Sequence, residues 1–386
     1  MLDFQNYLHR TRVHDNRLIH PDLYKRLERT YQPYSSCKKL VYLDHFVFRK
    51  MYNAVNGKND EDKSLWLSLY RILIDLRQKR KIFCPRSFLH EEEALLATHD
   101  KDSIKEFSES LSGDITLQYP EFILLQQVIL ALKRYIAEGT TEKVTYSPAN
   151  ILVDKKEAGT WMPYFNKSNP SEGIASQLQA ARDHHSDIID RALALGREHP
   201  NKSFTNCVDF FYESQIANIL RDFEDYLLKR EFQFPGFPLL AKKFYNGDLS
   251  KKSLKQSNSV LLIRVILDFL IKNDKRDNIS LEEKLISFFL SDQCKGIPAF
   301  SILNHLMGAI CIRGKNGQKK FKNNKSMMTD FEAVSYYMPY CDVMFLDNEI
   351  TNLLDEKNLK EYCQRYNTEI FSTKTEENII NYLARL

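Results

Sequence analysis

The chain has 386 residues, of which 43% are hydrophobic and 27% are charged, and its formal net charge at pH 7 is +4. This balance excludes a disordered chain and allows one or two domains with a full core, while so small a charge does not by itself indicate a nucleic-acid partner. The seven cysteines are scattered and form no Cys-x-x-Cys motif, which favours reduced thiols over disulfides or a zinc knuckle. The longest apolar stretch, Val260 to Ile271, is too short to cross a bilayer. We therefore expect a cytoplasmic protein with no membrane partner.

Short apolar runs of strand character alternate with helical patterns in the first hundred residues. Apolar residues at three- and four-residue spacing mark the helices, and Pro85 marks the end of the second strand. The last helix carries Glu91, Glu92 and Glu93 in its first two turns, where negative charge is favourable. The predicted order is a strand at Leu40 to Leu43, helices at Phe46 to Val55 and Lys63 to Arg77, a strand at Lys81 to Cys84, and a helix that begins near Ser87.

From about residue 100 to residue 295 the pattern changes to long helices. The stretch from Gly139 to Pro170 is loop-like. We expect an all-helical insertion in this range. Its predicted helices are Pro120 to Ala137, Gly173 to Glu198, Phe204 to Phe232 and Ser259 to Lys272.

After residue 296 strands and helices alternate again. A sheet assembled from both ends of the chain is the economical way to bury these apolar strands, so we expect an α/β domain formed by residues 1–99 and 296–386, with residues 100–295 inserted. The predicted elements are helices at Ile297 to Cys311 and Asp330 to Tyr337, a strand at Val343 to Leu346, a helix at Ile350 to Tyr366, a strand at Thr368 to Ser372 and a helix at Glu376 to Leu386.

Four acidic residues occupy positions from which they can meet at one edge of this sheet. Asp44 and Asp347 each follow an apolar strand, and the carboxyl ends of parallel strands are where α/β folds place their ligands. Asp330 is expected to begin the helix before the strand that ends at Asp347, and Glu93 lies two turns into the helix after Pro85. Carboxylates of this kind hold Mg²⁺ or Mn²⁺, and such ions promote phosphodiester hydrolysis.

Two blocks of sequence carry a resemblance to a known family. The block from Met328 to Asp347 is similar to the Asp-helix-strand-Asp ending of bacterial PIN-like proteins, and the block from Pro85 to Glu93 resembles their second acidic segment. The resemblance covers about residues 38–98 and 297–386. It implies a PIN-like α/β fold, a central parallel sheet flanked by helices, and a nuclease that chiefly cuts RNA with Mg or Mn, acting in bacterial toxin or phage-defence systems. The metal ligands that it implies are Asp44, Glu93, Asp330 and Asp347.

The choice among the three consecutive glutamates stays open at this point. We favour Glu93 because Ser87, His90 and Glu93 stand at three-residue spacing on one helix face. Glu91 and Glu92 remain alternatives, and the whole run also fits a solvated first turn.

The stretch from Arg313 to Lys325 holds six basic residues and no acid. It can contact a phosphate backbone, although a flexible surface loop fits as well. We expect it to bind an RNA substrate, in preference to single-stranded DNA, through Arg313, Lys315, Lys319, Lys320 and Lys322.

Other interpretations fit parts of the pattern. Asp44 and Asp347 are each well placed to cap the next helix. The stretch from Arg182 to Asp187 combines two histidines with two acids and could form a transition-metal site, but no second cluster completes it and an exposed polar helix face explains it better. A non-catalytic PIN-like protein that binds a partner or regulator through its helical insertion is the main functional alternative. A phosphatase with Asp44 as nucleophile would need a second Asp directly after it, which His45 to Val47 do not supply.

Overall fold

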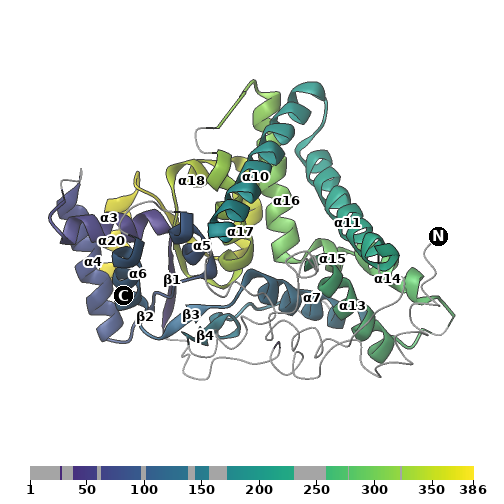
Figure 1. Cartoon of the computed structure of the whole chain (residues 1–386), viewed down its shortest axis with the longest axis horizontal. Helices are drawn as coiled ribbons and strands as arrows, with labels where there is room; N and C mark the ends of the chain where they lie inside the picture. Colours follow the sequence, from purple (N-terminus) through teal and green to yellow (C-terminus); the bar gives the residue numbers. More distant parts are fainter. Residues whose placement is uncertain are drawn as a thin grey trace. The chain divides into compact units, whose positions relative to one another are not determined.

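A computed structural model describes residues 27, 38–58, 62–96, 101–137, 144–155, 172–229, 258–276, 278–321 and 324–386. Most of these residues are helical, and residues of unit 2 (defined below) form a small parallel sheet (Figure 1). None of the described helices is both long enough and apolar enough to cross a bilayer.

The central sheet combines strands from both ends of the chain, as the sequence predicts. Its order is β2-β1-β5-β6 and all neighbouring strands are parallel. Strand β1 is buried on both faces, which explains its unbroken apolar sequence. At the amino end of the sheet, Asp342 accepts hydrogen bonds from Lys39 Nζ and from the Leu40 N–H, both 2.8 Å long, and so has a structural role. The strands are β1 (Lys39–Leu43), β2 (Ile82–Phe83), β5 (Val343–Phe345) and β6 (Glu369–Phe371).

Helices cover both faces of β1. Val41 and Leu43 point into a core formed with α3 (His45–Val55), α4 (Lys63–Gln78), α6 (Lys101–Ser112) and α20 (Glu376–Ala384). Trp66 of α4 stacks on Phe345 in this core, with ring centroids 5.8 Å apart. The alternate residue Tyr42 faces the other side, where α5 (Phe88–Leu96), α10 (Glu172–Glu198) and α17 (Asn324–Tyr337) lie (Figure 1). Because side chains alternate between the two faces of a strand, Asp44, the residue after β1, faces the same helices as Tyr42.

The structure corrects three expectations. Strands β3 (Ile115–Leu117) and β4 (Leu152–Asp154) pair antiparallel inside the range expected to be all-helical, and strands of three residues are too short to show a period in the sequence. Helix α17 begins at Asn324, so Asp330 lies within the helix and not at its start. The helix expected from Ile350 to Tyr366 is divided into α18 (Asn348–Leu354), α19 (Lys357–Cys363) and the 3₁₀ turn η3 (Gln364–Tyr366).

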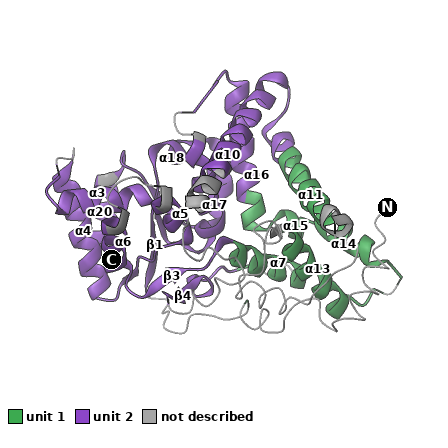
Figure 2. Ribbon diagram, viewed as in Figure 1, with its two compact units in different colours: residues 1–29, 121–144, 209–301 green, residues 30–120, 145–208, 302–386 purple. Residues whose placement is uncertain are grey.

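The chain divides into two compact units (Figure 2). Unit 1 comprises residues 1–29, 121–144 and 209–301, and unit 2 comprises residues 30–120, 145–208 and 302–386. Residues 145–208 thus belong to the same unit as the central sheet, whereas the sequence suggested one insertion over residues 100–295. The remaining described elements are α7 (Pro120–Ile136), η1 (Pro148–Asn150), α11 (Phe204–Lys229), α13 (Asn258–Asn273), α14 (Leu281–Leu290), α15 (Asp292–Lys295), α16 (Pro298–Lys315) and η2 (Met338–Tyr340).

Candidate metal centre

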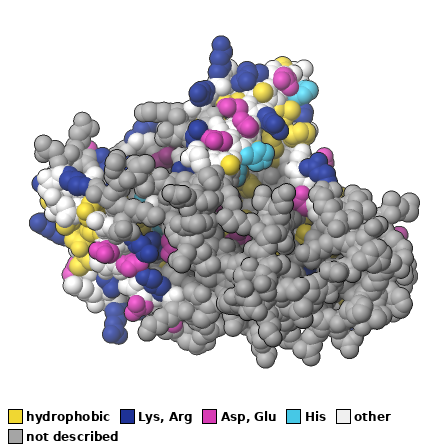
Figure 3. Space-filling model, viewed as in Figure 1, with side chains coloured by type: hydrophobic (Ala, Val, Ile, Leu, Met, Phe, Trp, Pro, Cys, Tyr) yellow, Lys and Arg dark blue, Asp and Glu magenta, His cyan; other side chains and the backbone are white. Residues whose placement is uncertain are grey.

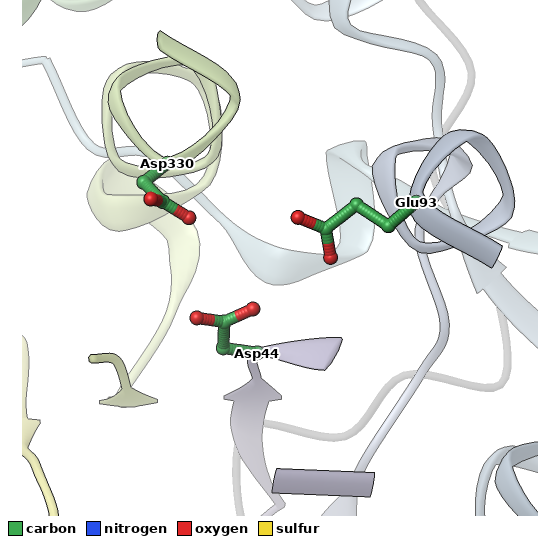
Figure 4. A group of neighbouring side chains, drawn as sticks. All are labelled: Asp44, Glu93 and Asp330. Carbon is green, nitrogen blue, oxygen red and sulfur yellow. The ribbon is translucent and has the colours of Figure 1, made fainter. Parts of the chain in front are cut away.

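Three of the four predicted acids meet in unit 2. Asp44, Glu93 and Asp330 each offer one carboxylate oxygen, and these atoms all lie within 4.8 Å of one another. The residues come from the end of β1, from α5 and from α17, and Figure 4 shows their carboxylates turned toward a common centre. An arrangement of this kind can hold a metal ion.

The position of Asp44 follows from the alternation along β1. Tyr42 faces α5 and α17, so Asp44, two residues later, leaves the strand on the same side. Its backbone N–H donates to the Phe345 carbonyl oxygen over 3.0 Å, which fixes the end of β1 against β5. Asp44 is the N-cap residue of α3, but among the described residues its side chain accepts no capping hydrogen bond. The carboxylate belongs to the acidic group, and the backbone N–H groups of His45 and Phe46 at the start of α3 lower its pKa.

Glu93 is positioned by the helix turn that precedes it. The Ser87 N–H donates to His90 Nδ1 over 2.9 Å, and the buried His90 ring stacks on Tyr42 with centroids 5.2 Å apart. This contact holds the start of α5 against β1, and Glu93 follows one turn later on the same face. The acidic group contains Glu93 and neither Glu91 nor Glu92, in line with the preference from helical spacing.

Asp330 projects from a buried part of α17. Its neighbours along the helix, Met327, Phe331 and Val334, are themselves buried. Helix α10 packs along α17 and also contacts α5. The two helices that carry Glu93 and Asp330 are thus held by the same third helix.

Burial and mutual repulsion oppose ionisation of the three acids. Burial raises the pKa of Asp44 and of Asp330 well above the ordinary range, and neighbouring carboxylates raise both further. Burial also raises the pKa of Glu93 to about 7, although Arg182 and Arg49 counteract it. Buried carboxylates that are held close together, with raised pKa values, are typical of a functional site. A bound divalent cation would neutralise their charges.

Asp347 lies outside the three-residue group. Its carboxylate accepts a 2.8 Å hydrogen bond from the Ile350 N–H and so caps α18, the alternative role that the sequence allowed. The register explains the difference, because Leu43 pairs with Phe345 and Asp347 therefore stands one residue farther along than Asp44. An offset of one residue turns a side chain to the other face of a sheet. Its charge still reaches the site, since it raises the pKa of Asp44, Glu93 and Asp330.

The basic residues after α16 are only partly available to a substrate. The Arg313 guanidinium pairs with Glu356 and donates to the Asn352 carbonyl oxygen over 3.1 Å, so its charge is engaged within the chain. Lys315 Nζ donates to the Lys202 carbonyl oxygen over 3.3 Å. Lys319 and Lys320 are exposed, and Lys322 lies outside the described residues. On the face in Figure 3, basic and acidic side chains are interspersed over the described surface.

Arg182 and His45 also lie near the acids; from the sequence, His45 could equally orient a ligand or pack in the core, and no role at the acidic group was assigned to Arg182. Arg182 of α10 places Nη2 3.9 Å from Glu93 Oε1. His45, next to Asp44, has its pKa lowered to about 4 by burial and by nearby arginines, so it is neutral at pH 7. Arg182 belongs to a stretch that fits an exposed polar helix face, and only the packing of α10 on α5 brings it to the acids.

No protein-family model, curated protein or solved structure matches the chain. The resemblance to PIN-like nucleases therefore stays a prediction based on the two blocks of sequence. The parallel sheet and the buried acidic group are properties of the structure itself.

Proposed function

We propose that the chain is a PIN-like nuclease that hydrolyses phosphodiester bonds with Mg²⁺ or Mn²⁺, acting on RNA in preference to single-stranded DNA. One observation carries this proposal. Acids from three separate elements converge beside the carboxyl end of β1, the edge of a parallel sheet at which α/β proteins bind their ligands. The order of these acids along the chain is also that of the resemblance.

The donor set fits a hard divalent cation. Asp44, Glu93 and Asp330 supply carboxylate oxygens, the ligands that Mg²⁺ and Mn²⁺ prefer. A bound ion would supply an activated water and would screen negative charge on the phosphate. In this proposal the three carboxylates are ligands and not nucleophiles, and Asp347 adds negative charge while it holds α18. The burial of Asp44 and Asp330 limits access of bulk water to their side of the site.

The resemblance also suggests a biological setting. Large PIN-like proteins of bacteria suggest a role as a toxin or a phage-defence effector. In such a role, the helices of residues 100–295 would bind a protein regulator.

The proposal is tested by cleavage of labelled RNA and single-stranded DNA oligonucleotides in Mn²⁺, in Mg²⁺ and in EDTA. The wild type should cleave RNA only with a divalent ion, and Asp44→Asn and Asp330→Asn should each reduce the rate at least a hundredfold. Glu91→Gln, on the same helix as Glu93 but outside the acidic group, is the matched control and should retain activity. Cleavage by the wild type in EDTA, or full activity of Asp44→Asn, would refute the proposal. An inert wild type that still binds Mn²⁺ would favour the non-catalytic alternative.

A further inference from the structure

The cationic side chain of Arg182, on α10, lies beside the acidic group. Arg182 Nη2 lies 3.9 Å from Glu93 Oε1, within ion-pair range but beyond hydrogen-bond length. The Arg182 side chain is 21% exposed, so it is partly open to solvent. Its charge also lowers the pKa of Asp330 and of His45. Arg182 therefore acts on Asp330 as well as on Glu93.

The position of Arg182 is fixed by the packing of α10. Helices α10 and α16 cross with their backbones in close contact. A Cβ on Gly196 would clash with the Cys311 carbonyl oxygen. A Cβ on Gly314 would likewise clash with the Leu193 carbonyl oxygen. Next to Arg182, Asp183 pairs with Lys325 of α17 over 2.7 Å. Helix α10 is thus tied both to α16 and to the helix that carries Asp330, which gives Arg182 a defined place beside the site.

The charge balance changes when the acids hold a cation. Without one, Glu93 is an ion-pair partner of Arg182. With a divalent ion on the carboxylates, Glu93 is neutralised by the ion, and the guanidinium keeps donors for another anion. Arginine presents five N–H donors in a planar arrangement that matches phosphate oxygens. Arg49, exposed on α3, adds a second positive charge that reaches Glu93.

We propose that Arg182 binds a non-bridging oxygen of the substrate phosphate, so that the phosphate is held between α10 and the carboxylate-bound ion. This inference rests on the proposed function for the identity of the ligand, a phosphodiester. Arg182 is a substrate-binding residue in this arrangement. The competing possibility is that Arg182 serves only as the counter-charge of Glu93, in which case its removal affects metal binding and not phosphate binding.

The two possibilities are separated by measuring RNA and metal binding on the same variants. Binding of a fluorescent RNA oligonucleotide is followed by anisotropy in Ca²⁺, with the integrity of the RNA checked on a gel, and Mn²⁺ affinity is measured by calorimetry. A hydrogen bond to a charged group contributes roughly 1.5–3 kcal/mol, so Arg182→Gln should weaken RNA binding about 10- to 100-fold. Its Mn²⁺ affinity should be unchanged or higher. Arg182→Lys, which keeps the charge but not the planar fork, should be intermediate.

Arg191→Gln is the matched control, because Arg191 is an exposed arginine of the same helix and its loss changes the net charge equally. It should bind RNA as the wild type does. In cleavage assays Arg182→Gln should raise KM for RNA by a factor similar to its loss of affinity. If Arg182→Gln does not fold, Arg182→Lys carries the test alone.

The outcomes separate this inference from the proposed function. Wild-type RNA affinity in Arg182→Gln, whatever its Mn²⁺ affinity, would overturn the inference while leaving a cleaving enzyme intact. A wild type that binds no RNA with or without divalent ions would also overturn it. A wild type that never cleaves, but loses RNA affinity on Arg182→Gln and not on Arg191→Gln, would support phosphate binding and refute the nuclease.

Discussion

Replacing Glu93 by glutamine should stabilise the metal-free protein in alkaline solution. The side chain of Glu93 is only 16% exposed and lies among other acids, and its pKa is raised to about 7 from the ordinary 4.5. The ionised form of Glu93 is therefore less favourable in the folded protein than in the unfolded chain. Glutamine has nearly the same shape without the charge, so Glu93→Gln removes the free-energy cost of ionising this side chain in the folded protein.

The size of the effect follows from the pKa of Glu93. One pKa unit corresponds to about 1.4 kcal/mol, so the interval from 4.5 to about 7 corresponds to roughly 3–4 kcal/mol. The sign is that of a carboxyl whose pKa is higher in the folded state than in the unfolded state. Its cost is absent well below pH 4.5, grows between pH 4.5 and about 7, and is complete above that. The advantage of Glu93→Gln should grow over the same interval.

Thermal unfolding in EDTA at pH 5 and pH 8 measures this advantage. Roughly 2–4 °C per kcal/mol is expected for a folding unit of about 150–250 residues, so Glu93→Gln should melt several degrees above the wild type at pH 8 and above it by only about a quarter of that difference at pH 5. Glu91→Gln, the same substitution on the same helix, should change little at either pH. A Glu93→Gln variant that is no more stable at pH 8, or whose advantage is the same at both pH values, would refute the electrostatic account of the site.

Three further predictions concern the ion, the cap and the helix crossing. Mn²⁺ at about 100 times its dissociation constant should stabilise the wild type by about 2.7 kcal/mol, and Asp44→Asn should lose most of that gain; an equal gain in both would contradict the ligand assignment. Asp347→Ala should cost about 1 kcal/mol in urea denaturation because it removes the bond from the Ile350 N–H, whereas Asp347→Asn should retain the cap; equal losses in the two variants would argue against a capping role. Gly196→Ala should destabilise the chain by about 1–3 kcal/mol, since its methyl group meets the Cys311 carbonyl oxygen; a neutral effect would show that α10 and α16 do not cross so closely.

The two central strands of the sheet were predictable because they are buried on both faces. Such strands appear as unbroken apolar runs, and the two at Leu40 to Leu43 and Val343 to Leu346 are found close to where the structure places them. The parallel pairing of these strands brings the ends of the chain together, which also places Asp44 near Asp330. Strands β3 and β4 gave no such signal, because three residues cannot define a period.

The composition of the acidic group was only partly predictable. Asp44 and Asp347 look equivalent in the sequence, since each ends an apolar run. The register of β1 against β5 separates them by one residue, and a single sequence does not contain that register. The start of α17 was missed because residues 324–329 include polar side chains without a clear apolar period, and the helix therefore seemed to begin at Asp330.

The position of Arg182 beside Glu93 could not be predicted from the sequence. Its place beside Glu93 depends on the packing of α10 on α5 and α17, which the close crossing at Gly196 and Gly314 helps to fix. Helical periodicity places Arg182 on a polar face of α10 but does not show what that face meets. Residues that act on a site from a neighbouring helix are thus found only when the packing is known.

The central claim is that Asp44, Glu93 and Asp330 together hold a divalent cation. Anomalous diffraction from crystals grown with Mn²⁺ tests it most directly, because manganese scattering locates the ion without reference to activity. The account predicts an anomalous peak within ligand distance, about 2.0–2.3 Å, of a carboxylate oxygen from each of the three acids. A crystal saturated with Mn²⁺ that shows no peak among these oxygens, or a peak bound only by other residues, would contradict it.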